Sequence, residues 1–273
     1  MHLEIYDWGG NGPPTLLAHP TGFHGRVWEP VARRLIAAGR RVWSFDFRGH
    51  GDSDPAPEGD DDWTGFITDA LLVTERLDLV GDPRLLAVGH SKGGAALLGG
   101  EIRRPGTYAR IWAYEPIVVP VDEPTELPIE NPMSTAALRR RDVWDSLDDA
   151  FAAYASKPPL DALTTQALRA YVDGGLRRRS DGRFELKCRP SYEARIYTTG
   201  GASGIYPRLG EVRCPVRVVC GDPDGSPPAT FGEQIVARLP RGELAHAAGL
   251  GHFGPLQDPD AMVASMLELA AVT

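Results

Sequence analysis

The sequence predicts an α/β fold: a doubly wound, mostly parallel sheet covered by helices on both faces, with an inserted helical lid. Short aliphatic or β-branched runs alternate with segments of helical periodicity along most of the 273 residues. This alternation is typical of parallel strands joined by crossover helices, and right-handed crossovers place those helices on both faces of the sheet. The alternation stops between about residues 118 and 210, which indicates an insertion.

Six runs are predicted to be buried strands, because each is short, apolar and ended by Gly, Pro, Asp or His. In chain order they read TLLAHP, RRVWSFDF, RLLAVG, RIWAYE, VRVVCGD and ELAHAA. Two helices are clear between them. The apolar residues of WTGFITDALLVTERL recur at i, i+3 and i+4 on one face, and RVWEPVARRLIAAG ends at Gly39, a common helix stop.

The insertion is predicted to form the helical lid. We expect a core made of residues 1–117 and 211–273 and a lid made of residues 118–210. The lid begins with a stretch rich in Pro and Glu and continues with the helical patterns TAALRRRDVW, SLDDAFAAYA and LTTQALRAYVDGGL. The arginine clusters at 139–141 and 177–179 are expected on solvated helix faces.

Composition narrows the possible partners and compartments. A formal net charge of −8 disfavours nucleic acid, since phosphate binding needs a basic face. No run approaches the roughly 18 apolar residues of a membrane span, and the N-terminal MHLEIYDWGG lacks the pattern of a secretory signal. Three cysteines form no C-x-x-C pair, and their odd number argues against a disulfide framework. We expect a cytoplasmic protein with a small-molecule partner and neither a nucleic-acid nor a membrane partner.

The pentapeptide GHSKG at residues 89–93 matches G-x-S-x-G between a predicted strand and a predicted helix. A side chain on so sharp a turn projects from the carboxyl edge of the sheet, and the two glycines remove side chains that would clash there. Ser91 is therefore the candidate nucleophile. A serine hydroxyl needs a base, and His252 supplies one on a glycine-rich loop after the last predicted strand.

A third group must orient the imidazole, and the sequence offers two candidates. The preferred one is Asp224, in the acidic loop that follows the strand VRVVC. Its neighbour Asp222 is better explained as a turn or cap residue beside proline. Glu115 is the alternative acid, because it closes the strand RIWAYE next to the predicted serine strand.

The order of Ser91, an acid and His252, together with GHSKGG and GLGHFGPLQDP, resembles the α/β-hydrolase superfamily. LLAHPTGFHGRVWEPVARRL resembles its oxyanion strand and first helix, and FDFRGHGDSDPAP resembles its D-x-R-G-x-G-x-S loop. The resemblance implies the α/β-hydrolase fold, with the insertion at the position of the family's variable lid between the sixth and seventh strands. Family members with Glu at the position of Glu115 sometimes use it as the acid.

The resemblance also implies an oxyanion hole, with one departure. The family commonly has His-Gly at the end of the oxyanion strand, whereas this chain has His19 and Pro20, and proline has no N–H to donate. By position, the two donors are the backbone N–H groups of Thr21 and Lys92. The Lys92 side chain is expected to pair with a nearby carboxylate, or alternatively to attract an anionic substrate group.

These features predict a serine hydrolase that cleaves a small carboxylic ester, lactone or similar acyl substrate through an acyl-enzyme on Ser91, without a cofactor. The same residues also fit a C–C bond hydrolase, an acyltransferase, a cofactor-free perhydrolase or a non-catalytic receptor for a small ligand. The loop FRGHGDSD is expected to form turns braced by its arginine, and no metal site is expected. Aromatic residues that could line an acyl pocket, with packing in the core as the alternative, are Phe23, Trp28, Trp144, Phe151, Tyr154 and Tyr197.

Overall fold

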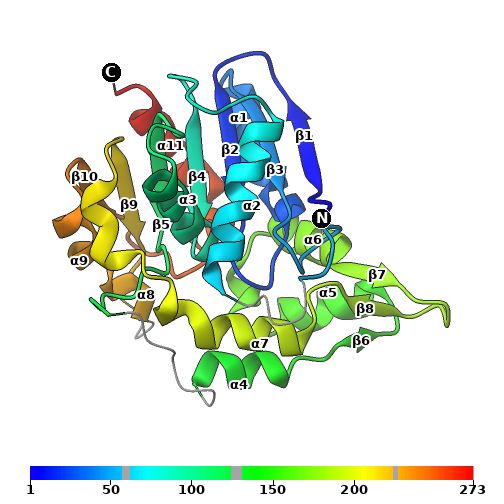
Figure 1. Cartoon of the computed structure of the whole chain (residues 1–273). Coiled ribbons are helices and arrows are strands. Elements are labelled where there is room, and N and C mark those ends of the chain that lie inside the picture. Colours follow the sequence, from blue (N-terminus) through cyan, green and yellow to red (C-terminus); the bar gives the residue numbers. More distant parts are fainter. Residues whose placement is uncertain (57–61, 124–130, 224–226, 273) are drawn as a thin grey trace.

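A seven-stranded sheet forms the centre of the protein (Figure 1). The computed structural model describes residues 1–56, 62–123, 131–223 and 227–272. The strand order is β1-β3-β2-β4-β5-β9-β10, with β1 antiparallel to β3 and the other neighbours parallel. The strands are β1 Ile5–Gly9, β2 Pro14–Ala18, β3 Arg41–Phe45, β4 Leu86–His90, β5 Arg110–Tyr114, β9 Val216–Cys220 and β10 Gly242–His246.

All six predicted strands are present in this sheet, although β10, expected to be buried, is a partly exposed edge strand; the seventh, β1, was not predicted. β1 lies at an edge of the sheet and is only partly buried, so its sequence lacks the continuous apolar run of the central strands. In contrast, β2 and β4 are buried along their whole length. Burial on both faces of a parallel sheet favours apolar residues at every position, which explains why the central strands were predictable.

Helices cover both faces of the sheet, as predicted. On one face α1 and α11 pack with Leu17, Trp112 and other strand residues, and on the opposite face α2, α3 and α9 pack with Leu16, Ile111 and Val218. The side chain of Asp62 caps α2 by accepting the N–H groups of Thr64 and Gly65. The core helices are α1 Glu29–Ala37, α2 Trp63–Arg76, α3 Lys92–Arg103, α8 Pro227–Thr230, α9 Gly232–Arg238, α10 Gly254–Gln257 and α11 Pro259–Ala270, with a 3-10 helix at Gly25–Trp28.

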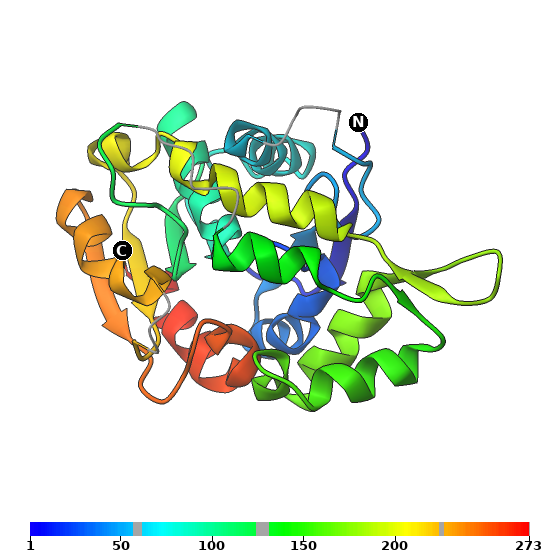
Figure 2. The same cartoon turned by 90° about the horizontal axis from the view of Figure 1, so that it is seen from below.

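The insertion separates β5 from β9, which are the fifth and sixth strands of this sheet in chain order, one fewer than the family's numbering implies. It lies along the carboxyl edge of the strands (Figures 1 and 2). It contains four α-helices, as well as short 3-10 helices, among its described residues. Its elements are α4 Pro132–Leu138, β6 Val143–Trp144, α5 Leu147–Ala155, α6 Thr165–Gly175, β7 Leu176–Arg178, β8 Phe184–Leu186 and α7 Pro190–Thr199, with 3-10 helices at Leu160–Ala162, Gly200–Ala202 and Tyr206–Glu211.

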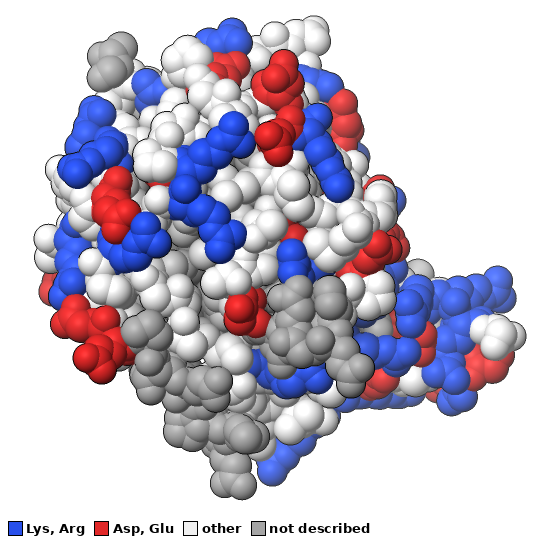
Figure 3. Space-filling model, in the orientation of Figure 1, with Lys and Arg blue, Asp and Glu red and all other residues white. Residues whose placement is uncertain are grey.

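Two expectations about the insertion were wrong. It is not purely helical, because β6, β8 and β7 form a small antiparallel sheet. Arg177 and Arg178 are exposed as expected but lie on β7, not on a helix face, and Arg179 follows β7. Glu185 pairs with Arg177 and Arg179, and Asp181 pairs with Arg179. The β7–β8 hairpin projects from the body in Figure 1, and Figure 3 shows Lys and Arg side chains gathered on the projection.

The second error concerns the other arginine cluster. Arg139 and Arg141 are exposed as expected, but Arg140 is not on a solvated face: its guanidinium is largely buried and is paired with Glu193 of α7. No helix in the described part of the chain is both long and apolar enough to cross a bilayer.

Candidate active site

Ser91 sits in the predicted strand–turn–helix context, between the last residue of β4 and the first residue of α3. Its backbone has φ 55° and ψ −118°, a conformation that a non-glycine residue rarely adopts and that the surrounding structure must hold. The Ser91 N–H donates to the Tyr114 carbonyl at 2.9 Å, and the Ser91 carbonyl accepts the Ile117 N–H at 3.2 Å. These bonds tie the turn to the segment around the end of β5.

The glycines of the motif are required by close backbone approaches. A Cβ on Gly89 would lie 2.5 Å from the Gly94 Cα, inside the first turn of α3. A Cβ on Gly93 would lie 2.2 Å from the Ala18 carbonyl oxygen at the end of β2. The start of α3 is therefore pressed against the loop that follows β2.

His252 and Glu115 form a short polar contact at this edge. His252 lies on the loop between β10 and α10, and its Nδ1 is 2.6 Å from Oε2 of Glu115. Glu115 directly follows β5 with φ 40° and is 1% exposed. Its second oxygen, Oε1, accepts the Gly221 N–H at 2.9 Å. A buried carboxylate held by two bonds in this way fixes the orientation and tautomer of the imidazole.

The His252 loop also touches the residue before the serine. Nε2 of His90 donates to the His252 carbonyl oxygen at 2.7 Å, and the two imidazole rings are 5.0 Å apart. Because His90 precedes Ser91, this bond anchors the His252 loop next to the serine turn.

The acid preferred from the sequence, Asp224, lies outside the described residues, so that assignment stays a prediction. Among the described residues, the carboxylate at His252 Nδ1 is that of the alternative, Glu115. Asp222 has the structural role expected of it, because its Oδ2 accepts the Gly249 N–H at 2.8 Å and its own N–H donates to the Leu250 carbonyl.

The positions expected to form the oxyanion hole lie where β2 and α3 meet. Thr21 is 5% exposed and lies in a tight turn closed by a bond from the Phe23 N–H to the Pro20 carbonyl at 3.3 Å. Lys92 is the first residue of α3, so its backbone N–H has no partner within the helix. The donor roles of these two N–H groups remain predictions.

The side chain of Lys92 is in an unexpected place. It is fully buried, and Nζ lies 3.3 Å from Nε2 of His50 and 4.4 and 4.3 Å from the ring centres of Phe47 and Phe66. The expected pairing with a carboxylate is wrong, since Nζ forms no ion pair within the described ranges. Burial lowers the pKa of Lys92 to about 7, because an apolar site disfavours the charged amine.

The loop FRGHGDSD has the bracing role that its sequence predicts. Arg48 forms a buried ion pair with Asp69 of α2 at 2.7 Å, and Asp46 accepts the N–H groups of Gly25 and Asp52. Burial raises the pKa of Asp46 to about 6. Across the described residues, no three His, Cys, Asp or Glu side chains are grouped as metal ligands.

The predicted pocket aromatics do not all lie together. The ring centres of Phe23 and Phe253, the residue after His252, are 5.2 Å apart. In the insertion, the ring centres of Trp144 and Tyr154 are also 5.2 Å apart. Trp28, however, is fully buried in the hydrophobic core. The two remaining aromatics lie in the insertion, where Phe151 stacks under the Arg169 guanidinium and the Tyr197 hydroxyl donates to Glu193.

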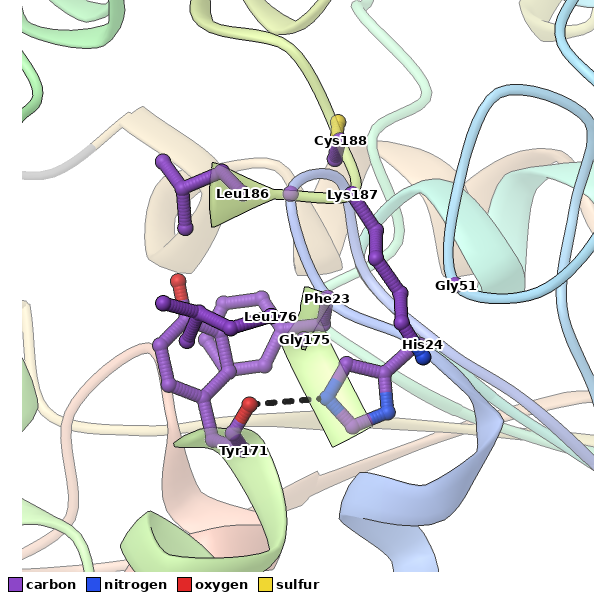
Figure 4. A pocket seen from close by; sticks show the side chains of 10 residues that line it. Phe23, His24, Gly51, Tyr171, Gly175, Leu176, Leu186, Lys187 and Cys188 are labelled. Atoms are coloured by element: carbon purple, nitrogen blue, oxygen red, sulfur yellow. Dashed lines mark hydrogen bonds between the residues drawn. The ribbon is translucent and has the colours of Figure 1, made fainter. Parts of the chain in front are cut away.

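Sequence reasoning missed Tyr171 and Phe253, which connect these groups. Tyr171 of α6 packs on Phe23 with ring centres 4.7 Å apart, and its carbonyl accepts Nε2–H of His24 at 3.0 Å (Figure 4). A cavity of about 10 Å³ beside them has room for about one water molecule. The position of Phe253 next to His252 was a usable signal, whereas nothing local marks Tyr171.

Comparisons with known proteins agree with this architecture. Residues 15–265 match the sequence profile described as the alpha/beta hydrolase family. Human monoglyceride lipase is 32% identical over 124 residues, which are 44% of this chain and 41% of the lipase. A 2-hydroxy-6-oxononadienedioate/2-hydroxy-6-oxononatrienedioate hydrolase from Dechloromonas aromatica is 23% identical over 95% of this chain and 87% of its own length.

Solved structures show the same fold over the whole chain. The crystal structure of E-2-(acetamidomethylene)succinate hydrolase superposes with a TM-score of 0.79 at 20% identity, covering 99% of this chain and 95% of that one. Since the matching family profile spans more than nine-tenths of the sequence and the sheet is mostly parallel, as predicted, the chain belongs to the alpha/beta hydrolase family.

Proposed function

We propose that this hydrolase cleaves a small carboxylic ester, lactone or similar acyl substrate through an acyl-enzyme on Ser91. The observation that carries the proposal is the 2.6 Å contact between His252 Nδ1 and the buried carboxylate of Glu115, at the sheet edge where Ser91 occupies its strained turn. A serine, an imidazole and a buried acid in this arrangement are the groups that nucleophilic acyl transfer requires.

In the first half-reaction, Glu115 keeps the proton of His252 on Nδ1 and leaves the lone pair on Nε2. Nε2 then accepts the proton of the Ser91 hydroxyl while Oγ forms a bond to the carbonyl carbon of the substrate. The imidazolium that results is stabilised by the Glu115 carboxylate, which is 1% exposed and therefore weakly screened. The same proton is then given to the leaving alcohol as the ester C–O bond breaks.

The negative charge that develops on the carbonyl oxygen needs donors already in place. The backbone N–H groups of Thr21 and Lys92 fit this role by position, and the N-terminus of the twelve-residue helix α3 adds a favourable dipole. In the second half-reaction a water molecule loses a proton to His252 and its oxygen bonds to the acyl carbon; the bond from that carbon to Ser91 Oγ then breaks, and His252 returns the proton to Oγ, which releases the acid.

A second candidate, hydrolysis of a C–C bond beside a carbonyl, uses the same three residues. It is favoured by two relatives that align over 95% and 93% of this chain and are named as hydrolases of 2-hydroxy-6-oxononadienedioate.

The cytoplasmic compartment expected from the cysteines also remains part of the proposal. Cys188, Cys214 and Cys220 are free and buried.

The proposal is tested by active-site labelling and a substrate panel. The purified protein is treated with a fluorophosphonate, and peptide mass spectrometry is expected to find the adduct on Ser91. A panel of short 4-nitrophenyl esters and lactones is then assayed with the parent and Ser91→Ala, and only the parent is expected to turn over. An adduct elsewhere, or parental activity in Ser91→Ala, contradicts the proposal. Tight ligand binding without turnover would instead identify a receptor.

A further inference from the structure

A buried polar cluster in the insertion faces the loop after β2. At its centre, the Arg140 guanidinium donates to one oxygen of the Glu193 carboxylate and to the Tyr171 hydroxyl, and lies 3.4 Å from the Tyr154 hydroxyl. The Tyr197 hydroxyl donates to the other Glu193 oxygen at 3.3 Å. We call Arg140, Tyr154, Tyr171, Glu193 and Tyr197 the insertion cluster.

The insertion cluster lies directly beside the proposed oxyanion hole. A Cβ built on Gly22, the residue after Thr21, would be 2.5 Å from Oε1 of Glu193, so the carboxylate packs against the Gly22 backbone. Helix α4 ends two residues before Arg140, and α7 carries Glu193. The two helices run side by side (Figures 1 and 2). A substrate whose carbonyl oxygen is held at the proposed Thr21 donor is therefore one residue away from the contact between Gly22 and this carboxylate.

The cluster carries one positive and one negative charge. Burial by itself lowers the pKa of Arg140, but the attraction of Tyr171 and Glu193 outweighs it and holds that pKa well above its usual value. Burial also raises the pKa of Tyr171, so its phenol stays protonated. The side chain of Glu193 is 7% exposed and that of Arg140 18%, which leaves little water to screen either charge.

From this geometry we infer that Glu193 neutralises Arg140 beside the Thr21 loop, so that the substrate group bound there is uncharged and anionic substrates are rejected. The inference rests on the proposed esterase function and names the class of substrate. An additional carboxylate placed against Glu193 would meet a like charge in a poorly screened site. Without the Glu193 charge, the planar guanidinium of Arg140 and the Tyr171 hydroxyl would be free to bind a carboxylate.

The experiment compares matched substrates that differ in one terminal charge. One series consists of 4-nitrophenyl esters of six-carbon acyl chains ending in a methyl, carboxamide or carboxylate group. The other consists of hexanoate esters of 4-hydroxybenzamide and 4-hydroxybenzoate, which place the charge on the alcohol side. Assays at pH 8.5 keep the nearby Lys92 amine mainly neutral, since its pKa is about 7.

The decisive variant is Glu193→Gln, which is nearly isosteric and leaves Arg140 charged. In at least one series, the ratio of kcat/KM for the anionic ester to that for the neutral amide is expected to rise about tenfold or more over the parent ratio. Arg140→Met leaves the carboxylate alone and is expected to lower that ratio. The double variant with both substitutions is neutral again and is expected to return close to the parent ratio.

Two controls keep the test decisive. Asp148→Asn removes one charge from the exposed Arg169–Asp148 pair of the same insertion and is expected to leave the ratio unchanged. If Glu193→Gln does not fold, as judged by its thermal transition, Arg140→Met, with a lowered ratio, and the double variant, with a ratio close to the parent's, still give different expectations. An active parent whose ratio is the same in every folded variant overturns the inference alone. A parent that hydrolyses no ester of either series overturns the proposed function, and this inference with it.

Discussion

The carboxylate of Glu115 lies 2.6 Å from Nδ1 of His252, although 137 positions separate the two residues in the chain. Glu115 follows β5, the strand next to the serine strand β4, and its other oxygen accepts an N–H from the end of β9. The Glu115 carboxylate thus lies where the ends of β5 and β9 meet the His252 loop. A carboxylate fixed in this way can orient the His252 ring.

We predict that Glu115→Gln lowers kcat by roughly 10⁴, because the amide favours the wrong tautomer of His252. The substitution is nearly isosteric, so the thermal transition should change little compared with kcat. Steady-state kinetics on the best ester of the panel provide the measurement. Asp224→Asn and Asp222→Asn are the matched controls, and both are expected to cost far less. If Asp224→Asn lowered kcat strongly and Glu115→Gln lowered it only slightly, the acid would be Asp224.

Lys92→Met is expected to stabilise the protein, most strongly below pH 7. The folded pKa of Lys92 is about 7 and the ordinary value is 10.5, so between these values the unfolded chain binds more protons than the folded one. The buried amine therefore lowers the free energy of unfolding of the parent at pH 7 and below, and this loss disappears as the pH rises from about 7 to about 10. Methionine binds no proton, so the variant has no such loss, and its side chain packs against Phe47 and Phe66.

Urea unfolding of the parent and Lys92→Met at pH 6, 8 and 9.5 measures the effect. The advantage of the variant should shrink as the pH rises. An advantage that is constant with pH would mean that the buried amine does not change its protonation on folding. Esterase activity should survive in the variant, because the backbone N–H of residue 92 is retained.

Aromatic residues of the insertion are predicted to set chain-length preference. Trp144→Ala and Tyr154→Ala should change the ratio of kcat/KM between octanoate and acetate esters more than they change activity on acetate, because both rings belong to the aromatic group that reaches Phe23 through Tyr171. Phe151→Ala is predicted from the sequence to do the same. Its ring stacks under Arg169, so a weaker effect is expected from the structure. Equal loss on every ester would point to a role in stability.

Gly93→Ala should damage the site through backbone crowding. The added methyl group would lie 2.2 Å from the Ala18 carbonyl oxygen, which forces α3 away from β2 and separates the two proposed oxyanion donors. We expect a destabilisation of about 1–3 kcal/mol together with a fall in kcat. Gly210→Ala is the control, because its nearest neighbour would be 3.9 Å from the new Cβ. Equal behaviour of the two variants in urea unfolding and kinetics would contradict the crowding argument.

The sequence by itself determined the features that depend on local patterns. Continuous apolar runs predicted the six strands that are buried or partly buried within the parallel part of the sheet, and glycines around Ser91 and His252 predicted where the backbone turns. Such signals are readable because burial on both faces, sharp turns and helix periodicity each restrict the residue types at neighbouring positions. The edge strand β1 escaped detection because IYDWG has no continuous apolar run; exposure alone does not explain this, since the similarly exposed edge strand β10 was predicted.

Only the tertiary structure decided which distant groups meet. From the sequence, Glu115 and Asp224 were both suitable acids at strand ends, and the described contact to His252 depends on where β5, β9 and the His252 loop converge. Arg140 looked like part of a solvated cluster until α7 brought Glu193 against it. The Lys92 amine likewise contacts two aromatic rings and an imidazole, where a carboxylate was expected from the sequence. A charge pairs with whatever the fold places within a few ångströms of it, and that distance is not written in the neighbouring residues.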